Sequence, residues 1–129
     1  MLLTFKLKHH QNFEAELTKA KKVAIFAMQT GSLSSKDVRE IGLPSVIACQ
    51  VLRKYARNRN LKTVHKVVLT VPGQAIKVDQ EMRELFISCL KLRLDLSYLP
   101  PFEKVNQIEM DHELAFVTVT INEPPLHEV

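Results

Sequence analysis

Cysteine and glycine are scarce in this chain of 129 residues, and each scarcity argues against a class of site. The two cysteines, Cys49 and Cys89, form no CxxC pair, and each lies in an apolar run. We therefore expect neither a disulfide nor a zinc site, and we interpret both thiols as reduced core residues. Gly31, Gly42 and Gly73 stand too far apart in the sequence to form a phosphate-binding loop.

Long apolar runs are also missing. The longest, residues 23–28, is far too short to span a bilayer. At the N-terminus Lys6 and Lys8 interrupt the apolar residues, so the segment lacks the apolar centre of a signal peptide. We expect a cytoplasmic protein with no membrane partner.

No constellation typical of catalysis is visible. His9 and His10 are adjacent, so on a strand they would point to opposite faces and could not share a metal ion. The other three histidines are isolated, and the acidic residues after Asp79 alternate with apolar positions or lie in predicted turns. We predict no enzyme, no metal site and no cofactor. A small enzyme is the least favoured alternative, which a deep pocket lined by convergent titratable groups would support.

Acidic residues are absent between Glu40 and Asp79, and this is the most informative absence. Residues 1–40 carry seven basic and four acidic side chains, residues 41–78 carry seven and none, and residues 79–129 carry four and ten. The net charge of +4 therefore hides a strongly basic middle and an acidic last part. Charge distributed in this way predicts a polyanionic partner.

The periodicity of apolar residues predicts a strand, then helices, then more strands. Leu3, Phe5 and Leu7 alternate with polar residues, which indicates a half-buried strand over residues 2–8. Three helices are predicted next: one from the cap Asn12 to Thr30, a short one with a capping box at residues 34–37, and one from Pro44 to about Asn58. The last two are compatible with a helix-turn-helix.

Six further strands are predicted, at residues 66–71, 74–78, 85–90, 92–96, 104–110 and 114–121. We expect an α+β fold: a small antiparallel β-barrel of about seven strands, with a two- or three-helix insertion between strand 1 and the remaining strands. The first strand should pair with strands from the last half of the chain. Residues 1–129 are expected to form a single compact domain, with the first barrel strand in 1–10, the helical insert in 11–60 and the remaining strands in 61–129.

The third predicted helix separates an apolar stripe from a polar side. The candidate nucleic-acid contacts on and after this helix are Gln50, Arg53, Lys54, Arg57, Asn58, Arg59, Lys62 and Lys66. Arg can place two N–H groups on a phosphate, and Asn and Gln can read base edges. Lys6 and Lys8, on the wet side of the first strand, are candidates that border the same groove. An ordinary solvated helix face is the alternative. Tyr55 could stack on a base, but its place on the apolar stripe favours a core role.

Several segments of the chain carry a resemblance to a known family: LLTFKLKHH, GLPSVIACQVLRKYARN, VPGQAIKVD, KVNQIEM and AFVTVTINEPP. Their order resembles the N-terminal region of the OrfB/TnpB insertion-sequence proteins, relatives of RNA-guided type V CRISPR nucleases. The resemblance covers nearly the whole chain. It implies a wedge barrel interrupted by a recognition helical insert, including a helix-turn-helix, that grips guide RNA and the adjoining DNA.

This chain departs from the family at its end, because it stops about where family members begin their RuvC-like nuclease half. The resemblance therefore does not carry over two-metal cleavage. We expect a nucleic-acid-binding module that grips structured RNA, adjoining DNA or both through the basic helix and the loop after it, without cutting. The alternative is a protein-interaction module whose acidic C-terminal third docks a basic partner or a separate nuclease half.

Overall fold

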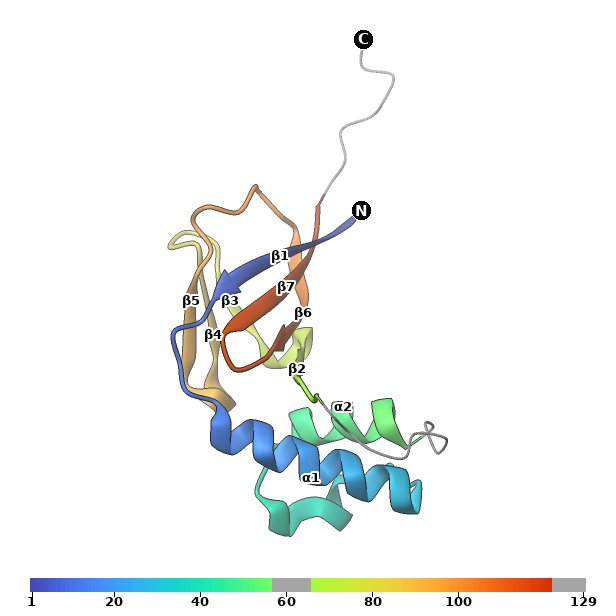
Figure 1. Cartoon of the computed structure of the whole chain (residues 1–129). Coiled ribbons are helices and arrows are strands. Elements are labelled where there is room, and N and C mark those ends of the chain that lie inside the picture. The colour runs from blue at the N-terminus through green and yellow to red at the C-terminus, as the bar shows by residue number, and fades with distance from the viewer. Residues whose placement is uncertain (57–65, 122–129) are drawn as a thin grey trace.

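The computed structural model describes residues 1–56 and 66–121, and the described elements form an α+β fold, as predicted. In chain order they are β1 (Leu2–Lys8), α1 (Glu14–Thr30), the 3₁₀ helix η1 (Ser35–Ile41), α2 (Ser45–Tyr55), β2 (Leu69–Pro72), the 3₁₀ turn η2 (Gly73–Ala75), β3 (Lys77–Asp79), β4 (Glu84–Ile87), the 3₁₀ turn η3 (Ser88–Leu90), β5 (Leu92–Asp95), β6 (Lys104–Met110) and β7 (Leu114–Thr120). The helices form a layer at one end of the strands (Figure 1).

The strands form two antiparallel sheets. One has the order β1-β7-β6-β2 and the other the order β3-β4-β5. In the first sheet β1 pairs with β7 along its whole length, from Leu2 opposite Thr120 to Lys8 opposite Leu114 (Figure 1). The prediction that the first strand pairs with the last half of the chain is therefore confirmed.

The predicted closed barrel is wrong, because the described strands form two open sheets. A barrel needs every strand to be paired on both sides. Here η2 and η3 convert parts of two predicted strands, 74–78 and 85–90, into turns, so that β3 has only three residues and β4 only four. The neighbouring strands β2 and β5 are also only four residues long. Within the described residues no ladder joins the two sheets.

The helix ends follow local signals with two corrections. The predicted cap Asn12 is wrong, because the N-cap of α1 is Phe13 and makes no side-chain cap bond. The Asn12 carboxamide oxygen instead accepts the Glu14 N–H at 3.0 Å, one residue before the cap. Gly31 ends α1 in the left-handed region, as predicted. The predicted short helix is a 3₁₀ helix, and its capping box is not formed. Instead the Ser32 hydroxyl donates to the Asp37 carboxylate at 2.7 Å, which uses the acidic side chain of the box.

The core joins the helical layer to the four-stranded sheet. Ile47 and Leu52 of α2 are fully buried, as are Leu69 and Val71 of β2, and α2 packs against β2. The predicted core position of Cys89 is wrong, because η3 turns the chain there and leaves this free thiol exposed, while Cys49 is half-buried. No helix within residues 1–56 and 66–121 is long and apolar enough to cross a membrane.

Candidate nucleic-acid interface

Helix α2 presents the predicted polar side on a firmly packed scaffold. Its apolar side chains, including Ile47 and Leu52, are buried in the core. On the other side Arg53 and Lys54 are exposed and Gln50 is half-buried. The predicted division into an apolar stripe and a polar side is therefore confirmed, and burial of the stripe holds the polar side in place.

The polar side of α2 borders a shallow hollow of about 300 Å³ on the outer face of the four-stranded sheet. Its lining consists of Gln50, Arg53, Lys54, Thr70, Gln107 and Glu109. The Gln107 amide donates to the Glu109 carboxylate at 3.1 Å. The hollow thus places two cationic side chains of α2 beside amide, hydroxyl and carboxylate groups of β2 and β6.

Glu109 and Gln107 were missed by the sequence reasoning. Glu109 belongs to the acidic last part of the chain, yet the pairing of β6 with β2 brings it to the edge of the basic helix. Alternation along residues 104–110 is the signal that marks an outward side. It is broken by a bulge between Val105 and Gln107, so the sequence pattern alone does not align these side chains.

Tyr55 is a core residue, as expected, rather than a stacking platform. The residue is 7% exposed, and its hydroxyl donates to the backbone carbonyl of Lys66 at 3.3 Å. Burial raises the pKa of the Tyr55 hydroxyl above its ordinary value. The Lys54 ammonium lies 6.0 Å from the ring centre, at the outer limit of a cation–π contact.

The other predicted contacts lie at different places. Lys66 is exposed, and its ammonium lies 3.6 Å from the Asp111 carboxylate. Lys8 lies 3.8 Å from the carboxylate of Glu113, and Lys6 is exposed on the same side of β1. The sheet order puts β1 at the edge opposite β2, so Lys6 and Lys8 do not touch the hollow beside α2.

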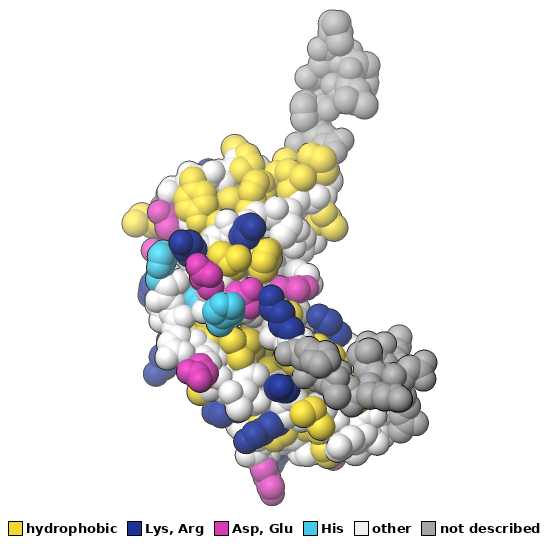
Figure 2. Space-filling model, in the orientation of Figure 1, with side chains coloured by type: hydrophobic (Ala, Val, Ile, Leu, Met, Phe, Trp, Pro, Cys, Tyr) yellow, Lys and Arg dark blue, Asp and Glu magenta, His cyan; other side chains and the backbone are white. Residues whose placement is uncertain are grey.

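Four of the predicted contacts lie outside the described residues: Arg57, Asn58, Arg59 and Lys62. Figure 2 shows one face of the molecule, on which basic, acidic and hydrophobic side chains are interspersed over the strands and further Lys and Arg side chains lie among other groups on the helical layer. The surface seen there is mixed in charge rather than uniformly basic.

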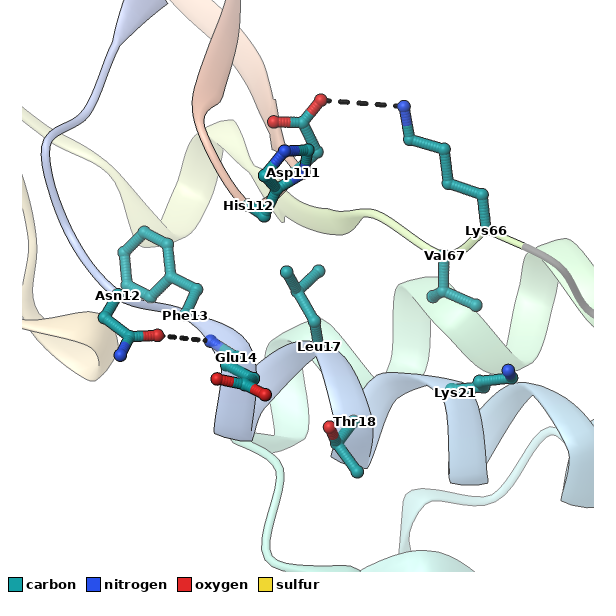
Figure 3. A pocket seen from close by; sticks show the side chains of 10 residues that line it. All are labelled: Asn12, Phe13, Glu14, Leu17, Thr18, Lys21, Lys66, Val67, Asp111 and His112. Carbon is teal, nitrogen blue, oxygen red and sulfur yellow. Dashed lines mark hydrogen bonds and ion pairs between the residues drawn. The ribbon is translucent and has the colours of Figure 1, made fainter.

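A second hollow, of about 410 Å³, lies between the first turns of α1 and the turn that joins β6 to β7 (Figure 3). It is lined by Asn12, Phe13, Glu14, Leu17, Thr18, Lys21, Lys66, Val67, Asp111 and His112. In Figure 3 the Asp111 carboxylate turns toward Lys66, whereas the carboxylate of Glu14 lies across the hollow on α1. The two carboxylates do not converge on a common point.

Asp111 is the best-connected polar side chain of this hollow, and its bonds stabilise the β6–β7 turn. One carboxylate oxygen accepts the backbone N–H groups of Glu113 at 2.9 Å and Leu114 at 2.6 Å. Burial alone would raise the pKa of Asp111, but these two N–H groups, together with the charges of Lys66 and His112, lower it below its ordinary value. The carboxylate is therefore held in its charged form.

His9 ties the end of β1 to the same turn. The residue is 3% exposed, and its ring lies 4.8 Å from the Phe13 ring, measured between centroids. The Gln11 N–H donates to Nδ1 at 3.0 Å, so the proton of the neutral ring is on Nε2, which donates to the Asp111 carbonyl at 2.9 Å. Both ring nitrogens are used in structural bonds.

Neither hollow gathers metal ligands within the part of the chain that the structure describes: no three His, Cys, Asp or Glu side chains there could hold a metal ion together.

A scan against protein-family models, a search of curated proteins and a search of solved structures find no significant match to this chain.

Proposed function

We propose that this chain is a nucleic-acid-binding module of the OrfB/TnpB type, which grips RNA, adjoining DNA or both through the polar side of α2 and does not cut them. One observation carries the proposal. Arg53 and Lys54 are exposed side by side on a helix whose other face is buried, next to a hollow rich in hydrogen-bonding groups. Such a surface can neutralise phosphates and still contact bases.

The rigidity of α2 supports this function. Leu52 and Ile47 are fully buried, so α2 presents its cationic groups from a fixed backbone. Arg53 brings a planar group that can donate two N–H bonds to one phosphate. Because the helix is held by the core, removing this side chain should change binding without changing the fold.

The protein-interaction alternative draws less support from the described residues. Acidic side chains of the last part of the chain already pair within the molecule: Glu84 with Arg93 at 2.7 Å, and Asp111 with Lys66. These pairs reduce the negative charge that a basic partner would meet.

The test is the salt dependence of binding for Arg53→Ala and for Arg53→Ala combined with Lys54→Ala. Each lost phosphate contact should flatten the slope of log affinity against log salt by about one unit and weaken different sequences by similar factors. RNA hairpins, single strands and duplex DNA serve as ligands, and they should remain intact with Mg²⁺ or Mn²⁺ present.

Lys77→Ala is the matched control. Lys77 belongs to the same acid-free part of the sequence, but it is exposed on β3 in the other sheet. The Lys77→Ala substitution removes one positive charge without changing α2, so it should leave the slope of log affinity against log salt unchanged. If the double variant keeps the wild-type affinity and slope on all three ligands, or if Lys77→Ala weakens binding as much as Arg53→Ala, the α2 interface is wrong.

A further inference from the structure

A row of side chains crosses the outer face of the four-stranded sheet and ends at α2. Successive strands pair Lys6 with Phe116, Phe116 with Glu109, and Glu109 with Thr70. Thr70 and Glu109 line the hollow that Arg53 of α2 also lines. The row crosses three spacings between neighbouring β-strands, a distance of about 14 Å. This distance equals the length of about four stacked nucleotides in a single nucleic-acid strand.

Phe116 lies in the middle of this row with its ring on the solvent side. Its neighbours in β7, Ala115 and Val117, are fully buried on the opposite face, whereas Phe116 itself is partly exposed. It does not belong to the core or to the partly buried residues packed against the core. On the same outer face the hydroxyls of Thr4 and Thr118 lie 3.0 Å apart. Phe116 thus lies on this face between Lys6 and Glu109 across the strands, and between Leu114 and Thr118 along β7.

The charges along the row alternate with neutral groups. Lys6 is at one end and Arg53 at the other, and the Glu109 carboxylate lies between them beside the Gln107 amide. A continuous phosphate backbone laid across the sheet would meet Glu109 and be repelled. Base amino groups would instead find acceptors in Glu109 and Gln107.

We infer that the outer face of the β1-β7-β6-β2 sheet is the base-reading half of the interface and binds an unpaired segment of nucleic acid. One base stacks on Phe116, its neighbour donates to Glu109 or Gln107, and the phosphates on either side approach Lys6 and Arg53. In a duplex the bases are stacked on each other and cannot lie on the ring, so the ligand class is single-stranded RNA or DNA. This inference rests on the proposed function and specifies its ligand.

The chain contains no tryptophan, which makes a direct test possible. Phe116→Trp introduces a single tryptophan at the proposed stacking position, which can be excited selectively over the two tyrosines. Its emission should be quenched by a single-stranded oligonucleotide and left unchanged by a perfect duplex of the same length. Thr118→Trp, one position along the same outer face, is the matched control and should respond more weakly.

Affinity provides the second measurement. Phe116→Ala should weaken single-strand binding about 5- to 150-fold, the range for loss of one stacked base, with the salt slope and duplex binding unchanged. Phe116→Leu, which keeps the apolar bulk without the ring, should not restore binding. Glu109→Gln removes the repelling charge and should strengthen duplex binding.

The outcomes separate this inference from the proposed function. If Arg53→Ala weakens binding but Phe116→Ala does not and Phe116→Trp is not quenched, the sheet inference is wrong and the α2 interface stands. If Phe116→Trp is quenched while the variants of α2 bind normally, the sheet binds nucleic acid and the α2 interface is wrong. Equal loss on single strands and duplexes in Phe116→Ala would overturn stacking as the role of this ring.

Discussion

Replacing Asp111 tests whether a single buried carboxylate holds the β6–β7 turn. The side chain is 9% exposed, and one of its oxygens accepts two backbone N–H groups, from Glu113 and Leu114. The other oxygen lies 3.6 Å from the ammonium of Lys66. Asp111→Ala removes all three interactions, whereas Asp111→Asn keeps an acceptor oxygen and loses the charge.

The magnitude follows from these contacts. Hydrogen bonds to a charged group contribute about 1.5–3 kcal/mol each, and the freed N–H groups of this surface turn recover part of that from water. The ion pair adds less than about 1 kcal/mol, because Lys66 is well exposed. We expect Asp111→Ala to lower the free energy of unfolding by about 2–4 kcal/mol and Asp111→Asn by about half as much.

The change of the free energy of unfolding with pH separates the effect of the Asp111 charge from an effect of packing. The pKa of Asp111 is lower in the folded protein than its ordinary value of 3.8. Its contribution to stability is therefore complete above the unfolded pKa and is lost as the pH falls through the folded pKa. The Asn variant should lose less stability than the wild type when the pH is lowered from about 5 to 3.

Urea denaturation at several pH values, followed by circular dichroism, measures both quantities. The slope of the free energy of unfolding against urea concentration should stay unchanged in the variants, so the effect appears as a shifted midpoint. Asp111→Ala with wild-type stability, or an Asn variant with the same acid dependence as the wild type, would refute the assignment of these bonds to Asp111.

Two further stability predictions use the same assay. Leu52 is fully buried, so Leu52→Ala should lower the free energy of unfolding by about 2–5 kcal/mol, whereas the exposed Arg53→Ala should change it by less than about 0.5 kcal/mol; equal effects would contradict the placement of α2. At Gly73 a Cβ atom would lie 2.9 Å from the carbonyl oxygens of Val105 and Asn106. Gly73→Ala should therefore lower the free energy of unfolding by about 1–3 kcal/mol. An unchanged urea midpoint would contradict this close contact between η2 and β6.

The elements themselves were largely predictable from local signals. The alternation of Leu3, Phe5 and Leu7 indicated β1, and the spacing of apolar residues together with Gly31 indicated α1 and its end. Pro44 marked the start of α2 correctly. These signals work because the side-chain periods of helices and strands, and the conformational freedom of glycine, depend on near neighbours in the chain.

The lengths and partners of the strands were less predictable. The runs at residues 74–78 and 85–90 look like strands in the sequence, but parts of them become 3₁₀ turns. Lys91 takes a positive φ of 51° after the second turn, which no sequence signal indicated. The exposed position of Cys89 follows from that turn. It was not predictable, because an apolar run alone does not indicate which of its residues face the core.

The candidate site was predictable only on its helical side. The sequence determined that α2 carries a buried apolar stripe and an opposite cationic side, because both follow from spacing within one helix. Only the tertiary structure decided that Glu109 lies beside that cationic side, and that Phe116 lies between Lys6 and Glu109. Those neighbours are set by which strands pair and in which register, and long-range pairing depends on the whole core rather than on any local pattern.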